Sequence, residues 1–170
     1  MSQVLERTLE QSNGWLEERR TGIGGSDIAA LCGVHPWRTP LEVYLEKIGA
    51  LEPRENERMK WGRLLEGVVA REFAERNGLR VRRLRSILRH PEQPVFLGTL
   101  DREAFGQGGR SPLEIKTTSA RHAEWWEEGP PEWVQCQLYW YMGLDPNYRD
   151  GWVAVLIGGQ EYRDWRLERD

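Results

Sequence analysis

The sequence is poor in cysteine, in long apolar runs and in excess positive charge. Its two cysteines, Cys32 and Cys136, lack the spacing of a metal-binding pair and predict a reducing, cytoplasmic setting. No apolar run approaches the roughly 20 residues of a membrane-spanning helix, so we expect no membrane partner. The N-terminus lacks the basic and then apolar pattern of a signal peptide. A net charge of −3 gives no global signal for nucleic-acid binding, so any DNA-binding surface must be local.

What the sequence does contain is typical of one folded domain. Of its 170 residues, 39% are hydrophobic and 30% are charged. This composition excludes a disordered chain, and the length allows a core of ordinary size. The sequence has no internal repeat and no inter-domain linker. We therefore expect a single domain over residues 1–170, in which N-terminal helices within 1–56 pack on a core formed by 57–170.

A predicted hairpin is the most informative part of the sequence. Apolar residues over Val95–Leu100, a glycine-rich turn and the run Leu113–Lys116 predict two strands joined to each other. Successive side chains of a strand point to opposite faces, so Glu114 and Lys116 share one face and the apolar residues of that run share the other. Asp101, at the end of the first strand, is expected to approach Glu114 across the pair.

Two carboxylates and a lysine on one small patch are the residue types of a divalent-metal site. Carboxylate oxygens are hard ligands that suit Mg²⁺, with Mn²⁺ as the alternative. Such a metal polarises a phosphate and lowers the pKa of a bound water, and a lysine beside it orients the attacking water or neutralises developing charge. An ordinary solvent-facing strand with a cross-strand ion pair has the same short pattern. The motif alone leaves both interpretations open.

A long helix is predicted over about 57–77, with Gly78 as its stop. Five apolar residues recur at helical spacing: Trp61, Leu64, Leu65, Val68 and Val69. Glu66 lies one turn after Gly62 on the flank of this stripe, where a glycine lets the backbone approach a strand while the carboxylate reaches a shared site. The helical wheel places Glu72 nearer the middle of the stripe. Periodicity therefore does not select between the two acids.

A glycine-rich segment over residues 19–33 is a candidate anion site. Arginines and three glycines precede Ser26 and an apolar run, which is typical of a loop that enters a capped helix. The N-terminus of such a helix suits a substrate phosphate, held by Arg19, Ser26 and backbone N–H groups. A serine N-cap after flexible glycines fits the pattern equally well.

Two further helices have clear local signals. The sequence Thr39–Glu42 supplies an N-cap, a proline at the first helical position and a capping box, and the helix should end near Gly49. The second helix is expected over 131–143, where Gln135 and Tyr139 share a face. A glutamine amide there can hold the lysine, a water or a phosphate oxygen, although a polar helix flank has the same appearance. Two final strands are expected over Gly151–Ile157 and Tyr162–Leu167.

Short motifs in a fixed order give the chain a resemblance to a known family. They are Gly22–Asp27, Trp61–Glu66, Gly98–Asp101, Leu113–Lys116 and Gln135–Gln137. From about residue 19 to residue 170, the chain resembles the YqaJ-type viral recombinases, relatives of the lambda-type exonucleases among the PD-(D/E)XK nucleases. The resemblance implies an α/β fold with a restriction-endonuclease-like core, in which helices flank a mixed central sheet. It also implies Mg²⁺-dependent hydrolysis of DNA phosphodiesters in a phage or bacterial host cell.

The resemblance assigns roles at the predicted hairpin and long helix. Asp101 would be the central metal ligand and Glu114 the second, while Ile115 would offer its backbone carbonyl. Glu66 would be a metal-site acid carried on the helix. Lys116 would position or activate water. Because the sequence has no cysteine set for an iron–sulfur cluster, relatives that hold such a cluster fit poorly.

The resemblance also reaches the two flanking segments. Gln135 matches the helical glutamine of the family motif, with Tyr139 beside it, and Gln137 is the weaker match. Arg19 and Ser26 resemble a pocket for a DNA 5′-phosphate, and the arginine next to Arg19 is the alternative.

Two classes of function remain. The first is a metal-dependent nuclease, favoured as a 5′-to-3′ exonuclease that acts on double-stranded DNA and prepares tails for a single-strand annealing protein; an endonuclease of the same fold is its variant. The second is a non-catalytic DNA-binding module, which the intact acids and lysine argue against. By analogy with lambda-type relatives, we expect a ring of identical subunits.

Overall fold

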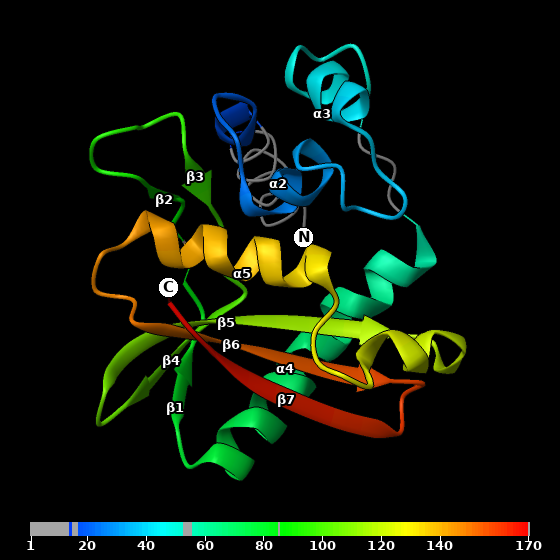
Figure 1. Ribbon diagram of the computed structural model, residues 1–170, viewed down its shortest axis with the longest axis vertical. Coiled ribbons are helices and arrows are strands. Elements are labelled where there is room, and N and C mark those ends of the chain that lie inside the picture. Colours follow the sequence, from blue (N-terminus) through cyan, green and yellow to red (C-terminus); the bar gives the residue numbers. More distant parts are fainter. Residues whose placement is uncertain (1–13, 15–16, 53–55, 85, 170) are drawn as a thin grey trace, which may run out of the picture.

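The computed structural model describes residues 14, 17–52, 56–84 and 86–169; residues 1–13 and 15–16 of the predicted N-terminal helical region lie outside these ranges. Its centre is a five-stranded sheet in the order β1-β4-β5-β6-β7, shown in Figure 1. The strands are β1 (Arg80–Arg82), β2 (Leu88–Arg89), β3 (Leu97–Gly98), β4 (Arg102–Gly106), β5 (Gly109–Thr118), β6 (Asp150–Ile157) and β7 (Glu161–Glu168). The helices are α2 (Gly25–Leu31), α3 (Pro40–Lys47), α4 (Glu57–Asn77), the 3₁₀ helix η1 (Ala120–Trp126) and α5 (Glu132–Leu144).

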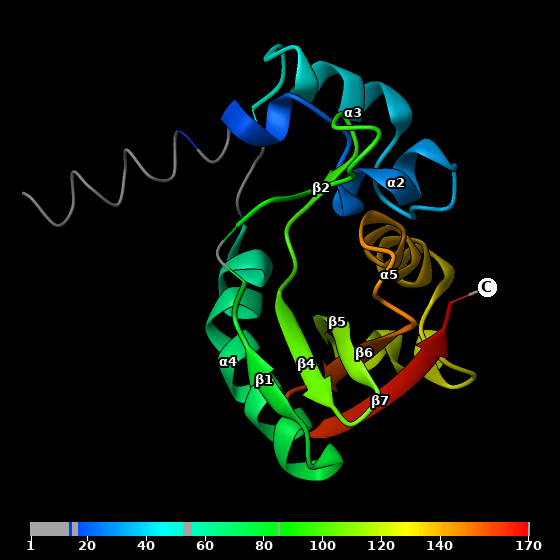
Figure 2. The same cartoon turned by 90° about the vertical axis from the view of Figure 1, so that its left-hand side faces the viewer.

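The sheet is mixed and lies between two helices. β5 and β6 are parallel, whereas the other neighbours in the sheet are antiparallel. Figure 2 shows α4 on one side of the sheet and α5 on the other. Val69 and Phe73 of α4 pack with Leu113 of β5, and Leu138 of α5 packs with Val153 of β6. The predicted fold class is therefore confirmed. Among the described residues, no helix combines the length and apolar character needed to cross a membrane.

The first strand of the predicted hairpin starts later than expected. β4 begins at Arg102, not near residue 95, and pairs antiparallel with β5. Leu97 and Gly98 instead form β3, which pairs with β2 in a separate two-stranded sheet. Leu97 is buried, and a Cβ added to Gly98 would lie 2.9 Å from the ring of Tyr141 in α5. The apolar character of this segment thus comes from packing under α5, not from a place in the central sheet.

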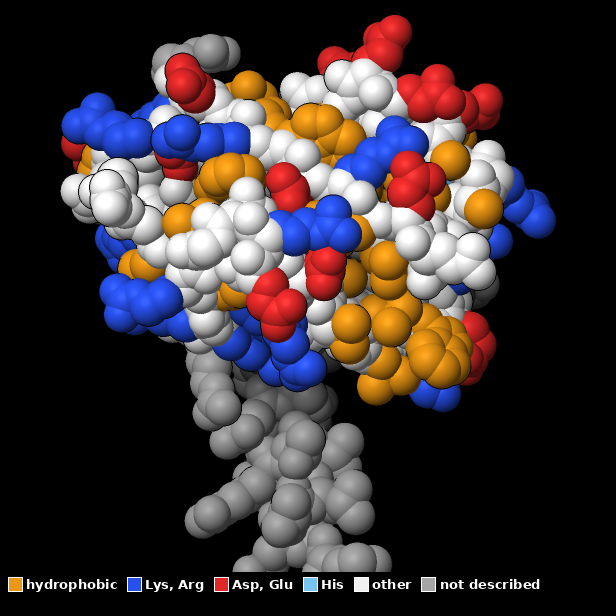
Figure 3. Space-filling view, turned by 90° about the horizontal axis from the view of Figure 1, so that it is seen from below, with side chains coloured by type: hydrophobic (Ala, Val, Ile, Leu, Met, Phe, Trp, Pro, Cys, Tyr) orange, Lys and Arg blue, Asp and Glu red, His pale blue; other side chains and the backbone are white. Residues whose placement is uncertain are grey.

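The long helix has the predicted bounds but not the predicted buried face. α4 begins after Asn56, whose side chain accepts a hydrogen bond from Met59 N at 3.0 Å, and ends at Gly78 with φ of 63°. Its buried residues are Val69, Ala70 and Phe73. Three members of the predicted apolar stripe are more than half exposed: Trp61, Leu64 and Val68. Figure 3 shows hydrophobic side chains gathered into an exposed patch on the lower face of the molecule.

The two N-terminal helices start with capping contacts. Thr39 N donates to Glu42 Oε2 at 2.7 Å, and Glu42 N donates to Thr39 Oγ1 at 3.3 Å, which confirms the predicted capping box at α3. At α2 the N-cap is Gly24, whose N–H donates to Asp27 Oδ2 at 2.9 Å. Ser26 therefore lies within the first turn, and its interpretation as the N-cap is wrong.

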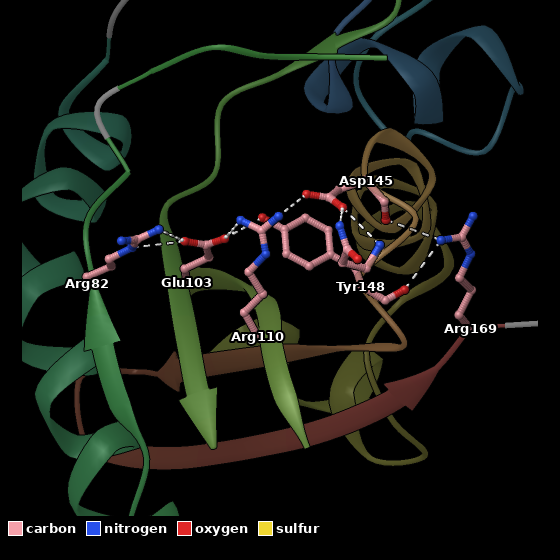
Figure 4. Close-up of polar contacts among 7 residues, drawn as sticks. Arg82, Glu103, Arg110, Asp145, Tyr148 and Arg169 are labelled. Carbon is pink, nitrogen blue, oxygen red and sulfur yellow. Dashed lines mark hydrogen bonds and ion pairs between the residues drawn. The ribbon is translucent and has the colours of Figure 1, made fainter. Parts of the chain in front are cut away.

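A buried carboxylate ties the sheet to the connection between α5 and β6 (Figure 4). Glu103 of β4 is fully buried. It accepts a hydrogen bond from Tyr148 Oη at 2.6 Å, and it pairs with Arg82 of β1 at 2.7 Å and with Arg110 of β5 at 3.3 Å. Arg110 also pairs with Asp145. This network fixes the end of the sheet next to the residues described below.

Candidate active site

Asp101, Glu114 and Lys116 meet at the start of β4 and the middle of β5. Asp101 directly precedes β4, and its Oδ2 accepts a hydrogen bond from Ile115 N at 2.9 Å. Lys116 Nζ lies 2.6 Å from Glu114 Oε1. Leu113 and Ile115 pack on the α4 side of the sheet, so the alternation of the strand turns Glu114 and Lys116 toward α5. The predicted approach of the two carboxylates and the shared face of Glu114 and Lys116 are both present in the structure.

The electrostatics of this cluster suit a divalent cation. Burial, followed by the negative charge of Glu114, raises the pKa of Asp101 well above its ordinary range. Burial also raises the pKa of Glu114, and Glu114 Oε2 is buried without a hydrogen-bond partner. Burial alone would lower the pKa of Lys116, but the two carboxylates outweigh it and raise that pKa. The buried Glu114 and the partly buried Asp101 share one lysine. They leave negative charge and an oxygen without a partner, which a hard cation would satisfy.

Glu66 reaches the same region from α4 but is engaged by an arginine. Its carboxylate pairs with Arg102, and its charge contributes to the raised pKa values of Asp101 and Glu114. A Cβ added to Gly62 would lie 3.4 Å from Thr117 Oγ1 of β5, so the helix does approach the strand at the predicted glycine. Within the described ranges, no three His, Cys, Asp or Glu side chains converge closely enough to hold a metal ion. The ligand role of Glu66 thus stays a prediction, in which the metal shares its carboxylate with Arg102 or replaces Arg102.

The glutamine beside the lysine is Gln137, not Gln135. Lys116 Nζ donates to Gln137 Oε1 at 3.0 Å, and Gln137 Nε2 donates to Tyr141 Oη at 2.8 Å. Gln135 Nε2 instead donates to Pro130 O at 2.6 Å. Gln135 therefore does not hold the lysine, and its role at a water or a phosphate oxygen stays a prediction.

The aromatic residue in the cluster is likewise Tyr141 and not Tyr139. Tyr139 is 37% exposed and lines an apolar pocket with Ile28 and Trp140. The phase of α5 explains why Gln137 and Tyr141 lie in the cluster. The buried face of this helix carries Val134, Leu138 and Tyr141. Position 137 lies on that face, since it is three residues after Val134 and four before Tyr141, whereas 135 and 139 lie to one side. The spacing of the apolar residues was the signal that would have favoured Gln137.

The predicted phosphate pair lies next to this cluster. Arg19 Nη2 donates to Ser26 Oγ at 2.7 Å. Arg20, the alternative, pairs with Glu52 on the surface at 2.9 Å. A Cβ added to Gly25 would lie 2.4 Å from the ring of Tyr141, so the start of α2 packs directly on α5. Ser26 therefore lies close to the catalytic candidates, because Tyr141 contacts both Gly25 and Gln137.

A cleft of about 280 Å³ connects the two parts of the site. Ser26 lines one part of it, and Lys116 and Gln137 line another. Much of the remaining wall is aromatic and includes Trp37 and Trp125. These tryptophans are far apart in the chain, and no local pattern predicts that they share one cleft with the lysine.

Comparisons with known proteins agree with this arrangement. Residues 14–144 match the YqaJ-like viral recombinase domain. The chain is 44% identical over 174 residues to the uncharacterized protein YqaJ of Bacillus subtilis (strain 168), covering 99% of this chain and 54% of that protein. The chain therefore spans about half the length of the curated relative that it matches.

Two solved exonuclease structures have a similar fold. An alkaline exonuclease from Laribacter hongkongensis superposes with a TM-score of 0.71 at 17% identity, over 93% of this chain and 82% of the other. A phage-related exonuclease from Haemophilus somnus 129PT superposes with a TM-score of 0.60 at 12% identity, over 88% and 85% of the two chains. At these identities the likeness concerns the fold alone. The family match, which covers residues 14–144, shows that the chain belongs to the YqaJ-like viral recombinase domain family.

Proposed function

We propose that this chain is a metal-dependent deoxyribonuclease that degrades double-stranded DNA from its ends in the 5′-to-3′ direction. The observation that carries the proposal is the pair of a partly buried Asp101 and a buried Glu114, with raised pKa values and the unpartnered oxygen of Glu114. Buried acids without full compensation are unfavourable for a fold, and they are found where a ligand or catalytic task requires them. Family membership and exonuclease neighbours of the same fold support this assignment.

The residues present fit Mg²⁺, with Mn²⁺ as the alternative. Asp101 and Glu114 would hold the ion, with the Ile115 carbonyl and Glu66 as the further ligands that the family resemblance implies. When bound, such an ion activates water and stabilises the charge of the scissile phosphate. Lys116, held between Glu114 and Gln137, presents an ammonium group that hydrogen-bonds the attacking water or a phosphate oxygen.

Selection of DNA ends is assigned to Arg19 and Ser26. A 5′-phosphate bound there would replace the hydrogen bond between the two side chains with charge-assisted hydrogen bonds to phosphate oxygens. Because Ser26 and Lys116 line one cleft, a terminal nucleotide would extend from this pair to the metal-site residues. One related exonuclease structure is of a complex with dAMP, a deoxynucleoside monophosphate of the kind that an exonuclease would release.

Three further features complete the proposal. A single-strand annealing protein would use the tails that the enzyme leaves, and a ring of identical subunits would keep it on one DNA molecule. The protein would act in the cytoplasm of a phage-infected or bacterial cell.

The test is digestion of DNA with Mg²⁺, using a linear duplex with a 5′-phosphate, the same duplex without it, and a closed circle. We expect loss of linear DNA only, faster with the phosphate, and abolished in Lys116→Ala. Lys60→Ala is the matched control, since Lys60 is exposed on α4 and pairs only with Glu57 at 3.5 Å among the contacts of the described residues. Cutting of the circle would indicate an endonuclease. If no DNA is cleaved with any divalent metal while DNA still binds, the chain is a binding module and the proposal is wrong.

A further inference from the structure

A group of aromatic side chains forms one wall of the cleft that contains Lys116. Trp37 lies in the loop between α2 and α3, Trp125 lies in η1, and Trp133 lies at the start of α5. The ring of Trp37 is 5.5 Å from that of Trp125 and 5.9 Å from that of Trp133, while Trp125 and Trp133 are 5.4 Å apart and perpendicular. We call this group the aromatic wall. Three separate segments build it, so it is a product of the tertiary fold.

Trp37 is unusual within this wall because it contacts neighbouring residues on one side and yet is largely exposed to solvent. This residue is 62% exposed, although large aromatic residues are normally buried to a large extent. Its backbone N–H donates to His35 Nδ1 at 3.2 Å, and Trp125 behind it is itself stacked on His122, with ring centroids 4.2 Å apart. The protein therefore supports one side of the Trp37 ring and leaves area for another molecule.

The position of the aromatic wall indicates the chemical class of that molecule. Ser26, of the proposed 5′-phosphate pair, and Lys116, of the proposed cleavage site, line the same cleft. One nucleotide joins a 5′-phosphate to the next phosphate in a DNA strand. With these phosphates at Ser26 and Lys116, its base would lie in the cleft that both residues line. The volume of about 280 Å³ is just below the usual range of about 300–1,000 Å³ for small-molecule sites. It can take one nucleoside but not a base pair.

We infer that the aromatic wall binds the base of the 5′-terminal nucleotide, after that base has left its pairing partner. This inference rests on the proposed function and names the part of the substrate that the cleft accepts. Stacking on tryptophan uses the flat face that every base has, so it does not require a particular sequence. The terminal base pair opens more easily than an internal one, and the wall would hold the freed base while the scissile phosphate lies at Lys116.

A binding measurement tests the inference without cleavage. The probe is the 5′-monophosphate of 2-aminopurine deoxyriboside, whose fluorescence falls when its base stacks on an aromatic ring, titrated with protein in EDTA. We expect saturable quenching with the wild type, little with Trp37→Ala, and most of it with Trp37→Phe. Trp61→Ala is the matched control, since Trp61 is 56% exposed on α4 and is not among the residues that line the cleft. Absence of quenching in the wild type, or equal quenching in Trp37→Ala, would overturn the inference.

A kinetic measurement separates this inference from the proposed function. Wild type and variants digest 5′-phosphorylated duplexes whose terminal nucleotide is either normal or abasic. Loss of one base–aromatic contact should lower kcat/KM by about 5- to 150-fold, both for the wild type on abasic ends and for Trp37→Ala on normal ends. For Trp37→Ala on abasic ends, kcat/KM should be only slightly lower than with either change alone. Equal cleavage of both ends by the wild type would reject the aromatic subsite and keep the nuclease; no cleavage of normal ends would reject the nuclease.

Discussion

Two acidic sites lie on neighbouring strands, and the chain compensates their negative charges differently. One is Glu103 in β4, and the other is Asp101, just before β4, with Glu114 in β5. Glu103 is surrounded by a tyrosine hydroxyl and two arginines, as Figure 4 shows. Asp101 and Glu114 share one lysine, have raised pKa values, and leave Glu114 Oε2 without a partner. The charge of Glu103 is compensated by side chains of the protein. The charges of Asp101 and Glu114 are only partly compensated, which is expected of residues that bind a ligand.

The comparison separates stability from function, and Asp101→Asn gives the largest expected effect. Removing one charge of the proposed metal pair should lower Mg²⁺-dependent cleavage by at least about 10³-fold. The metal-free protein should keep or gain stability. The substitution relieves repulsion with Glu114 and removes an acid whose charged form is unfavourable at this position, as its raised pKa indicates. Parallel DNA digestion and urea unfolding in EDTA measure the two quantities. A marked loss of stability would place Asp101 with the structural group.

Glu103→Ala is the opposite test. It removes the shared partner of Arg82, Arg110 and Tyr148, and breaking such a buried network by one member costs about 3 kcal/mol. We take the lower end of the usual range because the side chain of Arg82 is more than half exposed. Urea unfolding should show the loss, while the Mg²⁺ affinity of the folded protein should be unchanged. An altered affinity with unchanged stability would contradict the structural role.

Gln137→Ala and Gln135→Ala form a matched pair on one helix. Gln137 holds Lys116 in place, so its removal should lower cleavage by about 10- to 100-fold, as for residues that orient a metal-site group. Gln135 contacts Pro130 O, and its variant should retain nearly full activity. Comparable losses in both variants would show that the contact with Lys116 is not what matters.

Local signals explain what the sequence predicted well. The Thr39 capping box, the Asn56-to-Gly78 extent of α4, and the shared face of Glu114 and Lys116 all depend on residues a few positions apart. Strand alternation is fixed by covalent geometry. The core of the candidate site was therefore within reach of a single sequence.

Contacts between distant segments explain what the sequence did not predict. Arg102 engages Glu66 from 36 positions away, and the aromatic wall assembles Trp37 and Trp125 from different parts of the chain. The exposed face of α4 has ordinary helical periodicity, and only the position of β5 decides that Val69, and not Val68, is buried. The family motif favours Gln135, whereas the phase of the buried face of α5 favours Gln137, which is the glutamine that contacts Lys116.

Asp27 extends the comparison to a third buried carboxylate, with the smallest expected effect. Burial alone would raise its pKa, but Lys47 at 2.7 Å, the Gly24 N–H and Arg38 at 2.9 Å outweigh it and lower that pKa below the ordinary 3.8. A lowered pKa means that the stabilisation is complete above about pH 4 and is lost as the pH falls through the pKa of the folded state. Asp27→Asn keeps an acceptor for Gly24 N, so it should destabilise the protein by only about 1–2 kcal/mol at pH 7. In unfolding measured from pH 7 to pH 2.5, the free energies of wild type and variant should converge below pH 4; a constant difference would show that the ion pairs of Asp27 do not contribute.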